Sequence, residues 1–175
     1  MTKTFTDILA VGGKSNSLGR TNEVIEIVLE DKTQLNDLYD CIFNEDAWIR
    51  MRAIDAIEKV CRQQPEWLLP YIDKFQSELS SSNQPSIQWH LAQIYSQTPL
   101  TADQKLNATA WLKDLLSSTK VDWIVSANAM KTLVQFTKDG SVPNNDVIRL
   151  IRLQQKHASK SVVRKADKFL EELSR

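Results

Sequence analysis

The sequence predicts an all-α protein in which four helix pairs stack into a right-handed α-α superhelix behind a short N-terminal helical segment. The first observation is composition: the 175 residues include four glycines and five prolines, and apolar residues recur at helical spacing rather than alternating as they do in strands. The second is recurrence. A similar amphipathic pattern returns about every 37 residues, and repeats of this length are typical of helical solenoids.

The best copy of the pattern is residues 46–60. Its apolar side chains fall on one helical face: Ile49, Ala53, Ala56, Ile57 and Val60. The acidic turn at residues 44–46 supplies side-chain oxygens that can cap the first N–H groups of the helix. A helix with one apolar face needs a neighbour to cover it, so each copy is stable only within the stack.

The remaining helices are predicted from apolar residues that recur at helical spacing and from the loop-like segments between them. We expect helices at about residues 3–10, 23–30, 33–43, 46–62, 65–79, 86–96, 101–116, 123–136, 145–155 and 161–173. Thr21 or Asn22 can cap the second of these, and Thr101 with Gln104 has the form of a capping box. Pro70 is tolerated because it lies near the start of its helix.

Aligning the second helix of each pair by its apolar stripe places four residues in equivalent core positions: Ala53, Leu91, Ala127 and Ala166. The spacings are 38, 36 and 39 residues. The aligned position one helical turn before Ala127 is Trp123, which is therefore predicted to lie in the core. Trp111 falls on the apolar face of its own helix and is also predicted to lie in the core. We expect a single domain over residues 1–175, with 1–32 as an N-terminal cap and 33–175 as the repeats.

The acidic turn, Ile49-Arg50 and the spaced alanines resemble the second helix of HEAT repeats, which belong to the armadillo-like solenoids. The resemblance covers about residues 33–173 and implies that Arg50 braces the acidic turn. The middle two pairs depart from it, with Gln88 and Val125 where arginine is expected.

A narrower resemblance rests on the order of four segments: 12–24, 49–60, 65–68 and 88–93. Together they are similar to a group of small bacterial HEAT-like proteins. That resemblance implies a fold and no mechanism.

Composition restricts the functional classes. Lys plus Arg equals Asp plus Glu at 22 each, so no overall charge indicates nucleic acid or an anionic membrane. No apolar run reaches the ~20 residues that span a bilayer, and residues 8–11 are too short for a signal peptide. We expect a soluble, cytoplasmic protein in which Cys41 and Cys61 are buried thiols, with a disulfide as the alternative.

Charge is nevertheless uneven along the chain. Residues 21–46 hold eight acids and one base, whereas residues 144–168 hold seven bases and two acids. Self-association through the opposite charges, one extended partner, and ordinary segregation of solvated charge all fit this pattern.

The glycine-rich segment around Gly12-Gly-Lys-Ser15 invites comparison with a phosphate-binding loop. That loop needs a glycine five residues before its Gly-Lys-Ser, and Ile8 stands there. A looser anion site with Lys14 and Arg20 is an alternative. We favour a loop that packs Leu18 onto the first repeat.

No pattern indicates a metal, a cofactor or catalytic residues. His90 and His157 are the only histidines, and neither has a cysteine or carboxylate at metal-ligand spacing. Iron-holding HEAT-like hydroxylases resemble one another through His-Glu pairs, but Leu91 and Ala158 follow the histidines here. We therefore expect a non-enzymatic binding module with a protein partner.

Two rows lie beside the core stripe of the second helices, on the inner surface of such solenoids: Arg52, His90, Ser126 and Lys165, then Asp55, Gln93, Ala129 and Lys168. Trp48 and Trp89 lie off the stripes, and each either fills a gap between repeats or forms a recognition anchor. The predicted partner-binding residues are Trp48, Arg52, Asp55, Trp89, His90, Gln93, Lys165 and Lys168.

The alternative from another class is DNA repair, because one family of alkylpurine DNA glycosylases is built on HEAT-like repeats. Such an enzyme needs aromatic residues, a carboxylate and a basic field in one groove. Trp48, Arg52, Asp55 and Trp89 are the candidates for it. The balanced charge and the short chain argue against this alternative.

Overall fold

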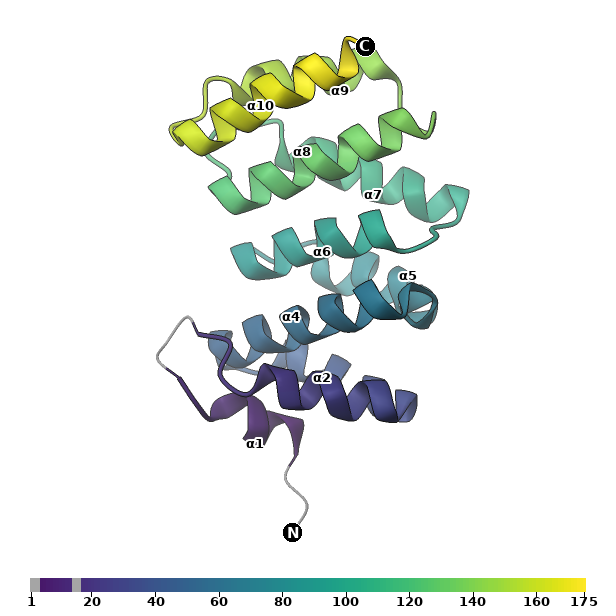
Figure 1. Ribbon diagram of the computed structural model, residues 1–175, viewed down its shortest axis with the longest axis vertical. Helices are drawn as coiled ribbons and strands as arrows, with labels where there is room; N and C mark the ends of the chain where they lie inside the picture. Colours follow the sequence, from purple (N-terminus) through teal and green to yellow (C-terminus); the bar gives the residue numbers. More distant parts are fainter. Residues whose placement is uncertain (1–3, 14–16) are drawn as a thin grey trace. The chain divides into compact units, whose positions relative to one another are not determined.

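A computed structural model describes residues 4–13 and 17–175, and over these residues the chain is helical and contains no strand. Figure 1 shows the helices in chain order. The chain divides into two compact units, Met1–Pro70 and Tyr71–Arg175, which are called unit 1 and unit 2 below. The single domain and the right-handed superhelix expected from the sequence stay predictions. Lys14, a candidate anion ligand, lies outside the described residues.

Unit 1 is built around α4. Its elements are α1 (Phe5–Ala10), α2 (Thr21–Glu30), the 3₁₀-helix η1 (Lys32–Gln34), α3 (Leu35–Asp40), the 3₁₀-helix η2 (Cys41–Phe43) and α4 (Ala47–Gln63). Helices α1, α2 and α3 all pack against α4. Cys41 and Cys61 are buried and form no disulfide with each other, and burial raises the pKa of the Cys41 thiol.

Unit 2 contains the remaining helices. The boundary between the units along the chain falls within the 3₁₀-helix η3 (Pro65–Tyr71). After it come α5 (Ile72–Lys74), the π-helix η4 (Phe75–Leu79), α6 (Pro85–Gln97), α7 (Ala102–Leu115), α8 (Trp123–Lys138), α9 (Asn144–Gln154) and α10 (Lys160–Leu173). Helix α8 packs against α6 on one side and α10 on the other. Figure 1 shows these three second helices side by side, with α7 and α9 behind them.

Each predicted helical segment is present, but two local predictions were wrong. Residues 65–79 do not form one α-helix, because Pro70 lacks an N–H and obstructs the preceding turn. The segment is instead 3₁₀, then briefly α, then π. The cap predicted for α2 is also absent: Arg20 occupies the N-cap without a side-chain hydrogen bond, and the Thr21 hydroxyl donates to the carbonyl of Leu18.

The capping residues of the second helices correct the register of the third pair. The N-caps are Asp46, Gln84, Asp122 and Ser159. Counting seven residues from each cap gives four fully buried equivalents: Ala53, Leu91, Ala129 and Ala166. Their spacings are 38, 38 and 37 residues.

The predicted equivalence of Ala127 was therefore wrong by two residues. Asp122 accepts hydrogen bonds from the N–H groups of Ile124 and Val125, which makes Trp123 the first helical residue. Trp123 is 49 % exposed rather than in the core, and Val125 takes the buried position.

The turns before the second helices are held by side chains at a fixed position. Arg50 Nη1 donates to the carbonyls of Asn44 and Glu45, each at 2.8 Å, so the bracing role predicted for Arg50 is confirmed. Gln88, at the same position of α6, donates to the carbonyl of Ser82 at 3.0 Å. Gln88 therefore braces the turn before α6 in place of the expected arginine.

The third pair uses a different support. Ser126 stands at the bracing position and its buried hydroxyl donates to Gln154 of α9. The amide of Gln154 in turn donates to the carbonyls of Leu116 and Ser118 in the turn before α8. This turn is therefore held by the following helix pair, which explains why an arginine is not needed there.

Candidate functional site

Arg52 in unit 1 is an interior residue and not the exposed contact that its row predicted. Its side chain is 4 % exposed. Nε donates to the carbonyl of Ser17 at 2.8 Å, Nη2 to that of Gly12 at 3.2 Å, and Nη1 to that of Leu9. The described residues on both sides of positions 14–16 thus surround the guanidinium, and the carbonyls of Leu9, Gly12 and Ser17, rather than amide groups, face this charge.

Gly19 shows how closely the segment approaches. Its φ is +51°, and a Cβ there would lie 2.6 Å from the Gly12 carbonyl oxygen and 3.1 Å from the Arg52 Cζ. Only glycine fits this place without a shift. Arg20 pairs with Glu23, with Nε and Oε2 2.8 Å apart, and Leu18 is 41 % exposed. The prediction that Leu18 packs onto the first repeat was therefore wrong.

The other two candidates of unit 1 differ from each other. Asp55, predicted to be a surface contact, is buried and forms an ion pair with Lys59 at 2.8 Å. Trp48 is 39 % exposed in the first turn of α4. Of the three residues predicted in unit 1, Trp48 alone presents a substantial surface to a partner.

The candidates on α6 form a local cluster. His90 is buried, its Nδ1 lies 2.6 Å from the carbonyl oxygen of Ser86, and its Nε2 accepts from the indole N–H of Trp89 at 3.3 Å. These bonds fit the neutral tautomer with the proton on Nδ1. Trp89 and Gln93 are half-buried. Burial therefore makes His90 unavailable as the surface contact that its row predicted.

The corrected register changes the predicted rows in α8. Ser126 and Ala129 are fully buried. In the corrected register, Asn128 is the equivalent of Arg52, and Lys131 is the equivalent of Asp55. Lys131 is exposed. The sequence prediction missed it, although the N-cap signal of an aspartate directly before Trp123 is the feature that finds it.

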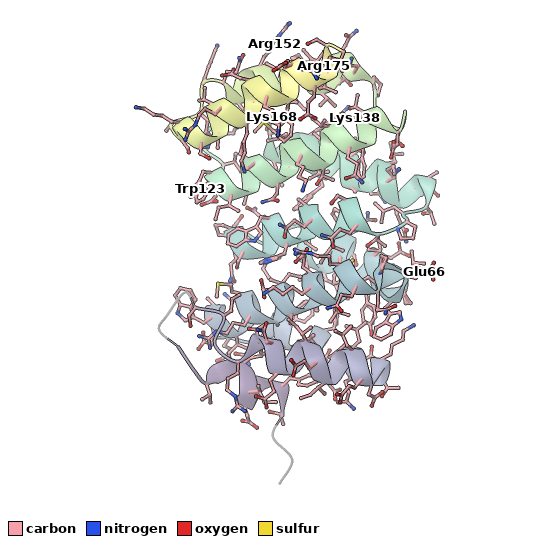
Figure 2. The ribbon with its side chains drawn as sticks, in the orientation of Figure 1. Glu66, Trp123, Lys138, Arg152, Lys168 and Arg175 are labelled. Carbon is pink, nitrogen blue, oxygen red and sulfur yellow. The ribbon has the colours of Figure 1, made fainter. Side chains whose placement is uncertain are left out.

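Unit 2 carries five exposed bases on α8 and α10. We call Lys131, Lys160, Arg164, Lys165 and Lys168 the basic face; all five are exposed, and none forms an ion pair with a described residue. Figure 2 shows Lys168 on α10, with Trp123 and Lys138 at opposite ends of α8.

Two of the three acids of α10 are already paired with bases outside the basic face, so Asp167 is the one acid of this helix whose charge is not balanced by an ion pair. Asp167 accepts from Gln155 at 2.7 Å. Glu171 pairs with Arg175 at 2.6 Å, and Glu172 pairs with Lys138 at 2.7 Å. The hydrogen bond from Lys138 holds the pKa of Glu172 below its ordinary value. The face therefore carries an excess of positive charge.

The described residues contain neither a candidate metal site nor a candidate membrane-spanning helix. No group of three His, Cys, Asp or Glu side chains is placed to hold a metal ion. Among the same residues, no helix combines the length and apolar character required to cross a bilayer.

The comparison with known families agrees with the repeat geometry. A family profile described as a HEAT repeat domain matches residues 14–138. The chain belongs to the HEAT repeat domain family. No curated protein and no solved structure gives a match, so the narrower resemblance to small bacterial HEAT-like proteins stays a prediction. HEAT repeats commonly mediate protein interactions. Residues 139–175 lie beyond the matched part, yet α10 continues the HEAT register of α4, α6 and α8.

Proposed function

We propose that this HEAT repeat protein is a non-enzymatic interaction module whose basic face, on α8 and α10, docks an acidic segment of a protein partner. The observation that carries the proposal is the set of five exposed bases that form no ion pair with a described residue, beside Glu171 and Glu172, which are already paired. Lys165 and Lys168 come from the rows predicted by the sequence, and Lys131 comes from the corrected register.

The energetics assign different roles to the charges and to Trp123. An exposed ion pair contributes about 0.2–1 kcal/mol, so the basic face would govern association rate and partner choice more than affinity. Buried aromatic anchors supply most of the energy in many interfaces. Trp123, half-exposed in the first turn of α8, is the residue we propose for that role. Trp48 would be a separate anchor on unit 1.

The test is capture of partners from the native cell by cross-linking and mass spectrometry, with the wild-type chain and two triple variants. Lys131→Glu, Lys165→Glu and Lys168→Glu reverse the basic face. Arg149→Glu, Arg152→Glu and Lys156→Glu make the same change of charge on exposed residues of α9 and just after it, and serve as the matched control. We expect an acidic partner to be recovered with the wild type and the control, and lost with the first triple. Equal recovery with all three would contradict the proposal.

The DNA-repair alternative is separated by a gel shift on alkylated duplex DNA at two salt concentrations. Protein docking predicts no shift at low salt. A salt-sensitive shift that the basic-face triple abolishes would favour nucleic acid as the partner of this surface.

A further inference from the structure

Unit 2 contains a cavity that the proposed docking surface does not use. It has a volume of about 510 Å³ and lies among α5, η4, α6 and α7. Its wall includes Asp73, Gln76, Ser77, Tyr95, Asn107 and Trp111. None of these residues belongs to the basic face.

Tyr95 gives the first sign that the cavity has an occupant. Its side chain is 2 % exposed, yet its hydroxyl has no hydrogen-bond partner among the described residues. Buried tyrosine hydroxyls usually find one. The hydroxyl oxygen is not among the fully buried atoms that lack a hydrogen bond, so it keeps contact with solvent, and Tyr95 lines the cavity from which a partner can reach it. Burial raises the pKa of Tyr95 above the ordinary tyrosine value, which already lies well above neutral pH.

The second sign is the shape of the wall. Gln76 and Ser77 belong to the π-helix η4, and short π-helical segments occur frequently at functional sites. The segment is held by defined contacts. The indole N–H of Trp111 donates to the backbone carbonyl of Ser80 at 3.0 Å, and the hydroxyl of Ser77 donates to the backbone carbonyl of Asp73 at 2.9 Å. These hydrogen bonds hold the π-helical backbone in place beside the cavity.

The third sign is chemical. The amide of Gln104 donates to Asp73 Oδ1 at 2.9 Å, and the amide of Gln76 donates to the Gln104 carbonyl at 2.7 Å. Each of these bonds uses one N–H of its amide, and the second carboxylate oxygen of Asp73 remains as an acceptor in the cavity wall for a ligand. No basic side chain lines the cavity. Its polar wall is suited to a cation that carries N–H donors.

An aromatic pair completes the site. The rings of Tyr95 and Trp111 meet edge to face, with centroids 5.8 Å apart, and Trp111 is half-buried. Ring faces attract ammonium and guanidinium groups, and tryptophan does so most strongly.

We propose that this cavity binds an organic ammonium or guanidinium group, with the Asp73 carboxylate as its ion-pair partner, the Tyr95 hydroxyl as an acceptor and the Trp111 ring against the cation. The group can belong to a free amine or to a lysine or arginine side chain of another protein. The proposal does not depend on the basic face.

The test uses the full chain and two classes of probe, followed by calorimetry and by the NMR shift of the Trp111 indole N–H, which Trp111→Phe identifies. The free cations are butylammonium and agmatine. The protein-borne cation is an acetylated Gly-Arg-Gly amide, and the same peptide with citrulline is its neutral control. We expect saturable binding of at least one cation, and at least tenfold weaker binding of citrulline.

The variants locate the binding. Asp73→Asn and Tyr95→Phe should each weaken it about tenfold, whereas Asp103→Asn, an exposed aspartate of α7 outside the cavity, should leave it unchanged. Tyr95→Phe keeps the packing, so a folded variant is expected. Binding of agmatine shows that a free cation suffices, and binding of the arginine peptide alone assigns the site to a protein side chain. The proposal is overturned by no cation binding, or by binding that neither Asp73→Asn nor Tyr95→Phe weakens.

Discussion

Helices α4 and α10 carry charged residues at the same two positions, and these residues have opposite fates. In α4 the positions hold Arg52 and Asp55, which are buried and bonded within unit 1. In α10 they hold Lys165 and Lys168, which are exposed and have no ion pair among the described residues. Residues 9–13 and 17–19 pack over α4, whereas no described segment covers this side of α10. Register therefore decides which residues form the core, and the covering segment decides whether a polar position is available to a partner.

The largest effect expected from this contrast is that of Arg52→Ala. Removal of the guanidinium leaves the carbonyls of Leu9, Gly12 and Ser17 without donors, and an unsatisfied buried group costs about 1–3 kcal/mol. We expect the free energy of unfolding of unit 1 to fall by about 3–5 kcal/mol in denaturant titrations. Lys165→Ala, the matched change in α10, should lie within about 0.5 kcal/mol of wild type. Similar losses in both variants would remove the distinction between the two helices.

The next effect tests the register of α8. Val125 is fully buried and Trp123 is half-exposed, so Val125→Ala should destabilise unit 2 by about 1.5–3 kcal/mol. Trp123→Ala should cost less than about 1 kcal/mol despite the larger side chain it removes. The alignment predicted from the apolar stripe requires the reverse order, and thermal unfolding of the two variants decides between them.

Gly19→Ala tests the contact between Arg52 of α4 and the residues that pack over it by changing one of those covering residues. The added Cβ would lie 2.6 Å from the Gly12 carbonyl oxygen at a φ of +51°, and we expect a loss of about 2 kcal/mol from strain and displacement of the loop. Gly140→Ala is the control, since its φ is also positive but nothing lies within 4 Å of the added Cβ. The control should lose about 1 kcal/mol. Faster amide hydrogen exchange in residues 9–13 should accompany Gly19→Ala alone.

Features that depend on residues close together in the chain could be predicted from the sequence. Helix positions, the Thr101 capping box and the Arg50 brace were predicted from the sequence and confirmed, because each depends on residues close together in the chain. The role of Arg52 depends on carbonyls 35 to 43 residues away, and no local pattern identifies that packing.

The register of α8 and the cavity beside Tyr95 also could not be predicted from the sequence. The stripe through Trp123 and Ala127 has helical spacing whichever residue begins α8, so spacing alone did not fix the register. The cavity beside Tyr95 needs the π-helix at residues 75–79, whose sequence is also compatible with an α-helix. Tertiary packing, rather than local preference, determines both features.

The smallest effect concerns the charge balance of α10. Lys138 holds the pKa of Glu172 below its ordinary value by a hydrogen bond at 2.7 Å. Because the folded-state pKa is lowered, the stabilisation is present above the unfolded value of Glu172 and is lost as pH falls through the folded value. Lys138→Ala should return the pKa of Glu172 toward that of an ordinary glutamate, as measured by carboxyl carbon NMR, and salt should diminish the difference.

The matched control is Lys113→Ala, which should raise the pKa of Asp146, its own partner at 2.9 Å, and leave Glu172 unchanged. If the pKa of Glu172 does not respond to Lys138→Ala, the acid is not neutralised by its partner on α8. The positive excess of the basic face would then be smaller than the ion pairs of α10 indicate, and the contrast with the buried charges of α4 would lose its electrostatic part.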